Sequence, residues 1–301
     1  MTRPRAFEAG PGRLDAVLAE ELGVSRAEAQ RAISSGGVTV DGVARAKSFR
    51  LLGGERVVAD LAPAADVPAE GPPVEVRYRD ARLAVVSKPA GVPTHPTEGR
   101  RRGTLVNRLL GMGIPLAPRS GPLRPGIVHR LDAGTSGLLV VACDDPTHEA
   151  LAAAFAAHVA DRRYLALVRG LVDHDRFEVD APLGRRGARI RLDATGGRAA
   201  ATVFEVRARF AGTTLLEAAP RTGRTHQIRV HLASTGHPIL GDRRYGGGGD
   251  DARALGLERP FLHAWRIAFD HPWTGDRLEL EDPLPEDLKR ALVRVRVRRE
   301  G

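Results

Sequence analysis

One carboxylate in this sequence lies where a catalytic acid would be expected. Asp132 belongs to the stretch HRLDAGTSG, residues 129–137, and the apolar run LLVVA follows directly. Such a run is typical of a buried strand, so Asp132 is predicted to lie in a loop at the edge of a sheet, where active sites are often built. A carboxylate there could serve as a nucleophile or as a base. The alternative is structural, because Asp side chains also cap turns.

A second stretch, residues 221–246, gathers groups that bind anions. A helix is predicted over HQIRVHLAST, residues 226–235, and Gly236 would end it. Arginines beside a helix start favour an anion, since the first N–H groups of the helix are unpaired. A metal site is disfavoured because the histidines are too irregularly spaced to share one helical face; an exposed polar surface is the other alternative. The stretch contains Arg221, Arg224, Arg229, His226, His231, His237 and Asp242.

Tyr164 opens a predicted strand, YLALVRG, residues 164–170. A tyrosine at the start of a strand usually packs in the core. The functional alternative is a ring that stacks on a nucleobase.

These residues need a scaffold, and from Val74 onwards the pattern is mixed α and β. A hairpin is predicted about Ala211 and Gly212, because apolar and polar residues alternate on both sides of them. Asp145 and Pro146 are predicted to start a long helix. Further strands are predicted in VEVRYRD (74–80), ARLAVVSKP (81–89) and GLLVVAC (137–143), whereas residues 97–130 are predicted to form a long, basic, irregular connection.

Residues 13–60 are predicted to form a small unit of their own. One helix would end at Gly23, and Ser25 with Glu28 forms a capping box for a second. Short strands follow, with a turn at Asp41-Gly42. We therefore expect a small α/β module over residues 1–61, a linker rich in alanine and proline over 62–73, and a larger domain over 74–301.

Charge indicates the partner. The chain of 301 residues has 46 Lys and Arg against 37 Asp and Glu, which gives a net charge of +9 and favours a polyanion such as nucleic acid. Cys143 is the only cysteine, which excludes a disulfide within the chain and a cysteine zinc site. We find no apolar signal segment and no run long enough to span a bilayer, so we expect a cytoplasmic protein without a membrane partner. The ending KRALVRVRVRRE is predicted to be a solvated basic tail.

The assembled motifs resemble those of pseudouridine synthases of the RluA type, the ribosomal large-subunit group. The resemblance covers almost the whole chain, and residues 13–60 resemble the small RNA-binding module of a ribosomal small-subunit protein and of some tRNA synthetases. Three departures are VTVDG, where the small module often has Asn before Gly, and Arg162 and Cys143, each where the family often has lysine. The motifs that carry the resemblance are VVSKPAGVPTHP (85–96), GTLVNRLL (103–110), RPGIVHRLDAGTSGLLVVA (124–142), RRYLALVRG (162–170), PRTGRTHQIRVHLASTGHPILGDRRYG (220–246) and FLHA (261–264).

The resemblance implies an enzyme that isomerises uridine to pseudouridine in RNA, without metal or cofactor. Asp132 would be the nucleophile or the base, Arg229 would keep it ionised, and Tyr164 would stack on the extruded uracil. Arg130 would fill the gap that the base leaves, and we also expect contacts with the RNA or the substrate from His129, Thr135 and Arg224.

The expected fold is α+β, a catalytic domain with a mostly antiparallel mixed sheet and a central cleft plus the N-terminal module, and the protein is expected to be a monomer. Large-subunit ribosomal RNA is the expected substrate, with tRNA as an alternative. A different class, a non-catalytic RNA-binding protein such as an assembly factor, is favoured by the charge but not by the set of acid, tyrosine and arginine.

Overall fold

The computed structural model describes residues 4–34, 36–60, 67–97 and 99–297. The chain divides into two compact units, residues 1–67 with 120–123 and residues 68–119 with 124–301. Residues 62–66 of the predicted linker lie outside the described residues.

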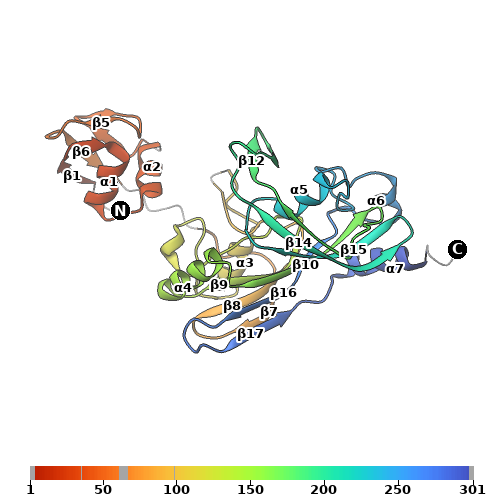
Figure 1. The fold of residues 1–301 in the computed structure, drawn as a ribbon. Helices are drawn as coiled ribbons and strands as arrows, with labels where there is room; N and C mark the ends of the chain where they lie inside the picture. The colour runs from red at the N-terminus through yellow and green to blue at the C-terminus, as the bar shows by residue number, and fades with distance from the viewer. Residues whose placement is uncertain (1–3, 35, 61–66, 98, 298–301) are drawn as a thin grey trace. The chain divides into compact units, whose positions relative to one another are not determined.

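The first unit combines two short helices with a small sheet (Figure 1). Gly23 ends the first helix in the left-handed conformation, and the Ser25 hydroxyl accepts a hydrogen bond from the Glu28 N–H, as predicted. Asp41 and Gly42 both have positive φ, which is the geometry of a tight hairpin turn. The elements are α1 (Leu14–Leu22), α2 (Arg26–Ser34), a sheet in the order β1 (Arg5–Glu8), β6 (Arg56–Ala59), β3 (Val38–Val40), β4 (Val43–Ala44), and the pair β2 (Gly12–Arg13) with β5 (Arg50–Leu51).

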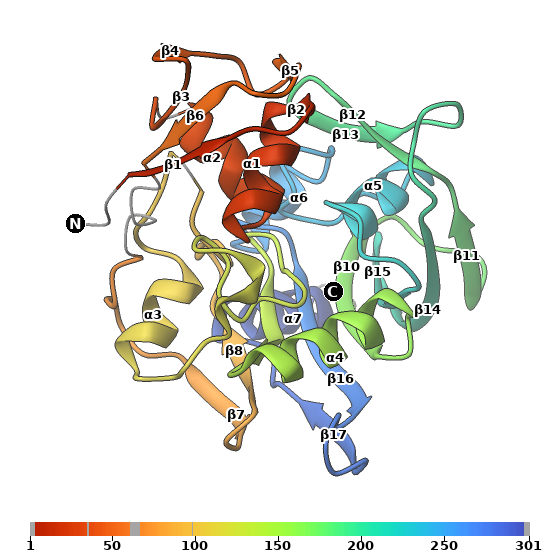
Figure 2. The same ribbon diagram turned by 90° about the vertical axis from the view of Figure 1, so that its left-hand side faces the viewer.

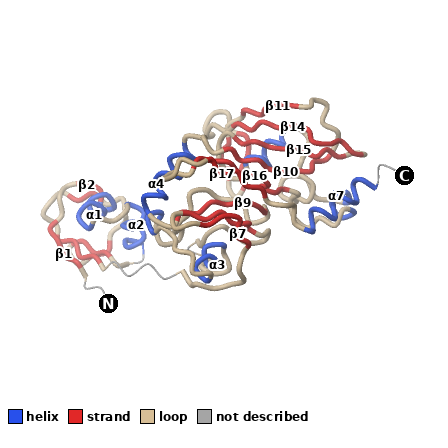
Figure 3. The backbone as a smooth tube through the Cα atoms, turned by 90° about the horizontal axis from the view of Figure 1, so that it is seen from below, coloured by secondary structure: helices blue, strands red, loops and turns tan. Residues whose placement is uncertain are grey.

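The second unit is built on one nine-stranded sheet, which can be followed from β11 to β7 in Figure 3. All strand pairs of this sheet in the described residues are antiparallel except β16 with β9. The predicted α+β class with a mostly antiparallel mixed sheet is confirmed. The order is β11 (Arg176–Asp180), β14 (Ala201–Phe210), β15 (Thr213–Pro220), β10 (Asp161–Arg169), β16 (Leu262–Asp270), β9 (Ser136–Ala142), β8 (Leu83–Lys88), β7 (Glu75–Arg79), with β17 (Arg277–Glu281) also paired to β16.

The sheet has an apolar core on each face around β8 and β9. Alternate residues point to opposite faces of a strand, and the two cores divide these strands in that way: Leu139 and Val141 belong to one cluster, whereas Leu138 and Val140 belong to the other. Because both faces are covered, all seven residues of β9 are buried.

Helices supply the cover on both sides. The helix α4 (Asp145–Ala156) packs Leu151 and Phe155 into the cluster that contains Leu138. The opposite cluster contains residues of α3 (Leu105–Gly111), α5 (Gln227–Ser234), α6 (Asp250–Ala254) and α7 (Glu286–Val297). A separate hairpin of β12 (Leu183–Arg186) and β13 (Arg189–Leu192) packs Leu183 and Ile190 with Val230 of α5 (Figure 2).

Two predictions about regular structure were wrong. Residues 97–130 are not irregular throughout, since they contain α3, where Thr104 and Asn107 form a capping box and Leu105 and Leu109 are buried. The C-terminal stretch is not a solvated tail up to Val297, because α7 buries Leu288, Ala291 and Val295. In both segments a short apolar stripe with helical spacing is hidden among many arginines.

In the part of the chain that the structure describes, no helix combines the length and the apolar character needed to cross a lipid bilayer.

Candidate active site

Asp132 and Arg229 meet although they are 97 positions apart. Asp132 lies in the loop just before β9, and Arg229 lies in the first turn of α5. The Arg229 Nη1 donates a hydrogen bond to Oδ2 of Asp132 at 3.0 Å. The other edge of the guanidinium donates to both carboxylate oxygens of Asp242, at 2.7 and 2.9 Å. One cation therefore bridges two carboxylates.

The ion pair is shielded from water. The side chains of Asp132 and Arg229 are 16% and 11% exposed, and that of Asp242 is 1% exposed. Burial opposes the charge on Arg229, but the hydrogen bonds and negative charge of Asp242 and Asp132 outweigh it and raise the pKa of Arg229. A permanent guanidinium thus stands against an oxygen of Asp132, and an adjacent cation favours the ionised form of a carboxyl group.

Asp132 opens onto a cavity of about 590 Å³, large enough for a nucleoside. Basic side chains and apolar side chains share its wall, so it can hold a flat ring while attracting phosphates. The lining includes all seven residues predicted for the site, which are His129, Arg130, Asp132, Thr135, Tyr164, Arg224 and Arg229, together with His95, Arg124, Arg162, Leu131, Ile228 and Leu262.

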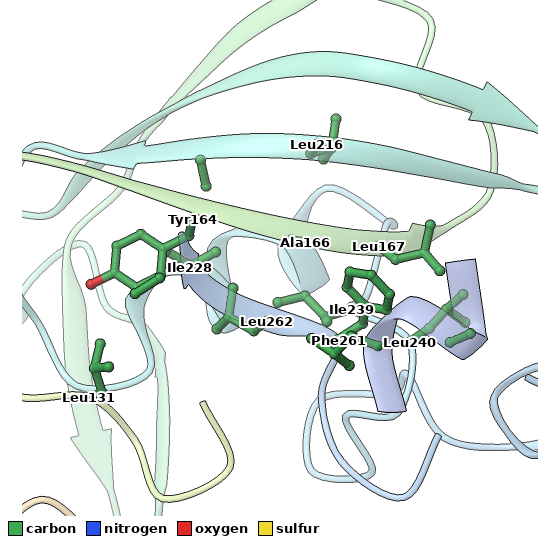
Figure 4. Close-up of a cluster of buried hydrophobic side chains, with 14 of the residues drawn as sticks. Leu131, Tyr164, Ala166, Leu167, Leu216, Ile228, Ile239, Leu240, Phe261 and Leu262 are labelled. Carbon is green, nitrogen blue, oxygen red and sulfur yellow. The ribbon is translucent and has the colours of Figure 1, made fainter. Parts of the chain in front are cut away.

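Tyr164 projects from β10 and is 7% exposed. Its ring lies at the end of the apolar cluster near Ile228, with the hydroxyl turned to the side of Leu131 (Figure 4). The pairing of β10 with β16 shifts register between Arg163 and Tyr164, an irregularity that re-aims side chains and is common beside active sites. Burial raises the pKa of the Tyr164 hydroxyl, so the phenol stays protonated at neutral pH.

The four predicted contact residues differ in their surroundings. Arg130 is exposed, whereas Arg224 is partly buried and its Nε donates to the Ala199 carbonyl at 3.1 Å. Thr135 is buried, and its N–H donates to the Asp132 carbonyl at 3.0 Å.

His129 contacts β9 and α4, next to the loop that carries Asp132. Its Nε2 accepts the Val140 N–H at 2.9 Å, and its ring stacks on Phe155 with 4.4 Å between centroids. Burial, with a smaller effect of Arg162, lowers the pKa of His129 to about 3, so the ring is neutral. Thr135 and His129 therefore also hold the loop that carries Asp132.

Sequence reasoning missed Lys88, which supports the loop from the opposite side. Its side chain is fully buried, and Nζ donates to the carbonyls of Pro89, Val92 and Ala133 at 2.9, 2.8 and 3.3 Å. Burial lowers the pKa of Lys88 to about 7, which the charge of Asp132 opposes. The available signal was its place in the motif VVSKPAG, because a lysine that ends an apolar strand is unusual.

Two further features of the site were not predicted. One is the presence of Tyr245, and the other is the position of His226 between Tyr245 and Asp132. The His226 Nδ1 is 2.7 Å from the Tyr245 hydroxyl, and its Nε2 is 3.8 Å from Oδ2 of Asp132. The ring of Tyr245 also lies 5.0 Å from the Arg229 guanidinium. No local sequence pattern predicts these contacts, because they depend on how the chain folds after α5.

The site is suited to chemistry on a nucleotide sugar, since a shielded carboxylate lies beside a cation, an aromatic ring and an arginine-rich rim. A sequence model described as RNA pseudouridylate synthase matches residues 82–234, and one described as S4 domain matches residues 12–57. The chain therefore belongs to the RNA pseudouridylate synthase family, and it is an isomerase that makes pseudouridine in RNA.

Relatives match over nearly the full length. The chain is 40% identical over 289 residues to YlyB of Bacillus subtilis (strain 168), named an uncharacterized RNA pseudouridine synthase, with 94% of both chains covered. It is 40% identical to the ribosomal large subunit pseudouridine synthase D of Nitrosomonas europaea, covering 94% of this chain and 84% of that one. These relatives confirm the resemblance to the RluA type.

Solved structures agree on the fold. The human RNA pseudouridylate synthase domain containing 1 aligns with a TM-score of 0.56 at 26% identity, over 74% of this chain and 87% of that chain. The human domain containing 4 has a TM-score of 0.59 at 24% identity, over 73% and 92%, and supports the fold alone.

Proposed function

We propose that this enzyme isomerises uridines of large-subunit ribosomal RNA, with Asp132 as the group that reacts at the target sugar. The observation that carries the catalytic assignment is the buried contact of 3.0 Å between Asp132 and Arg229 at the wall of the cavity. The substrate assignment is supported by relatives named ribosomal large subunit pseudouridine synthase D.

The reaction breaks the bond between the ribose and a ring nitrogen of uracil, and then joins the ribose to a ring carbon. Asp132 either attacks the sugar carbon as a nucleophile or removes a proton from the sugar so that uracil leaves. Both routes need a carboxylate that faces the sugar, and the hydrogen bond from Arg229 holds Asp132 at the cavity wall. The ring carbon that receives the sugar must finally lose its proton to a base. We assign that step to the Asp132 carboxylate, which is free again once the new bond has formed, and the protonated Tyr164 hydroxyl assists by hydrogen bonding.

The uracil has to leave its stack to reach Asp132, which costs a few kcal/mol. Stacking on the Tyr164 ring offsets part of that cost. We assign Arg130, which is exposed at the cavity, to the space that the base leaves in the RNA. Arg224, His129 and Thr135 complete the proposed contacts with the nucleotide.

We further propose that the enzyme works as a monomer in the cytoplasm. The single cysteine fits a reducing compartment, and the whole constellation of acid, arginine and tyrosine comes from one chain.

The catalytic assignment is tested with Asp132→Ala and Asp132→Asn on transcribed ribosomal RNA, with pseudouridine read by chemical adduct mapping. We expect at least a thousandfold loss of turnover in both variants, because neither side chain can attack the sugar or take its proton. The exposed Asp173 offers a matched control, and Asp173→Asn should keep wild-type turnover. Near-normal turnover in either Asp132 variant would remove this residue from the chemistry.

The substrate assignment is tested by mapping pseudouridines in cellular RNA with and without the gene. We expect sites to disappear from large-subunit ribosomal RNA. Loss confined to tRNA would instead establish the alternative substrate with the same chemistry. No loss from ribosomal RNA or tRNA would overturn the substrate assignment.

A further inference from the structure

His226 has a left-handed backbone conformation, which few residues other than glycine adopt. It directly precedes α5 with φ 57° and ψ 18°, which is the left-handed region. Residues other than glycine keep this conformation where the surrounding structure imposes it, and such positions cluster at functional sites. The conformation alone is no proof of a role, but the contacts of the ring point to one.

The His226 ring stands between Tyr245 and Asp132. Its Nδ1 is 2.7 Å from the Tyr245 hydroxyl, and the two rings meet edge to face with 5.5 Å between their centroids. Its Nε2 is 3.8 Å from Oδ2 of Asp132. Tyr245 also carries the Arg229 guanidinium 5.0 Å from its ring. Tyr245 thus contacts both groups that face Oδ2 of Asp132, the His226 ring and the Arg229 guanidinium.

For a neutral His226 ring, a single arrangement of hydrogens satisfies these contacts. An ionised Asp132 can only accept, so the nitrogen that faces it, Nε2, should carry the hydrogen. In the neutral ring Nδ1 is then an acceptor, and the Tyr245 hydroxyl donates to it. Burial lowers the pKa of His226, and the positive charges of Arg229 and Arg244 act in the same direction. The negative charges of Asp132 and Asp242 oppose this shift without reversing it, which agrees with a neutral ring.

The two oxygens of Asp132 have different surroundings, which bears on which of them reacts. Both Arg229 and His226 approach Oδ2, and among the described residues no hydrogen bond of Asp132 involves Oδ1. Resting on the proposed role of Asp132, we propose that His226 is a positioning residue: with its tautomer set by Tyr245, it joins Arg229 in holding Oδ2 and leaves Oδ1 to react with the sugar. The distance of 3.8 Å exceeds a hydrogen bond, and we expect it to shorten when the substrate closes the cavity.

Three substitutions separate this role from folding and from RNA binding. Tyr245→Phe keeps the ring under Arg229 but removes the donor to Nδ1, and should lower kcat about tenfold with KM for RNA unchanged. His226→Asn tolerates the left-handed backbone but is too short to reach Asp132, and should lower kcat about 100-fold. His226→Gln can place an amide N–H where Nε2 was, and should recover part of that loss.

The control is His174→Asn, the same change at an exposed histidine outside the cavity, which should leave kcat unchanged. Thermal unfolding of each variant shows whether it is folded. A direct readout comes from ¹⁵N shifts of histidine-labelled enzyme, in which His226 should be the Nε2–H tautomer in the wild type and a mixture in Tyr245→Phe.

Wild-type kcat in both Tyr245→Phe and His226→Asn would overturn the proposal, and so would effects on KM alone or an Nδ1–H tautomer in the wild type. These results would leave Asp132 intact as the reacting group as long as Asp132→Ala stays inactive. If Asp132→Ala retained activity, the proposed function itself would fail.

Discussion

At the scale of single residues, the site depends on one arginine shared by two acids. Asp242 is almost completely buried and takes two hydrogen bonds from Arg229, which leaves a single Nη1 contact for Asp132. This division places one N–H group of Arg229 against Asp132 without enclosing the carboxylate in a bidentate pair. Asp242 thus has a role that the sequence did not suggest, since it lies among glycines and arginines without a motif that marks an acid.

Asp242→Asn tests that role. The amide cannot accept both hydrogen bonds, so Arg229 should turn towards Asp132 and occupy it more fully. We expect kcat to fall roughly tenfold or more, and the free energy of unfolding to fall by about 3 kcal/mol, because a buried ion pair is broken.

Steady-state kinetics and urea unfolding measure the two effects. The matched control is Asp251→Asn, whose carboxylate is 59% exposed and pairs with Arg169 at the surface. Equal changes of kcat and of unfolding free energy in the two variants would show that Asp242 does not hold Arg229 in position.

At the scale of elements, the loop that carries Asp132 is fixed by β9 and α4 together. His129 bridges them, since it accepts the Val140 N–H of β9 and stacks on Phe155 of α4. Because this partly buried histidine is neutral, the connection is sensitive to acid.

The pKa of His129 is about 3 in the folded protein against an ordinary 6.5. Between these values the unfolded chain binds more protons, so stability is full above pH 6.5 and falls as the pH falls towards 3, by up to about 1.4 kcal/mol per pH unit. In His129→Gln, whose amide oxygen can replace Nε2 as acceptor, the slope of unfolding free energy between pH 6 and pH 4 should be shallower. Urea titrations at several pH values measure it.

His174→Gln, at an exposed histidine, should keep the wild-type slope. An identical slope in His129→Gln and the wild type would mean that His129 takes up its proton without penalty.

At the scale of the whole molecule, a net charge of +9 makes association with RNA depend on salt. The β12–β13 hairpin is one source of this charge. Leu183 and Ile190 face the protein, so the alternate residues, Arg189 and Arg191 among them, lie on the opposite face and are exposed.

The double change of Arg189 and Arg191 to glutamine should weaken RNA binding and lower the slope of log affinity against log salt by about one to two units. Turnover at saturating RNA should be unchanged. Filter binding over a salt series measures the slope.

The same charge is removed in a control with Arg290 and Arg296 changed to glutamine on the exposed side of α7. If both pairs lowered the slope equally, net charge rather than the hairpin would explain the binding.

Much of this protein could be predicted from its sequence because the relevant signals are local. The apolar run of β9, the capping residues of α2 and the Asp41-Gly42 turn each specify their own conformation. Motifs that resemble a known family then indicated Asp132, Tyr164 and Arg229. The short helix α3 and the helix α7 were missed because arginines and prolines obscured a stripe of only two or three apolar residues.

What the sequence alone determined was the family, most of the elements other than α3 and α7, and the candidate acid with its arginine. Only the tertiary structure decided how Arg229 is shared with Asp242, how His226 and Tyr245 approach Oδ2, and how Lys88 ties the loop down. The physical reason is that hydrogen bonds within an element follow from residues a few positions apart, whereas these contacts join segments brought together only by burial of the two cores of the sheet.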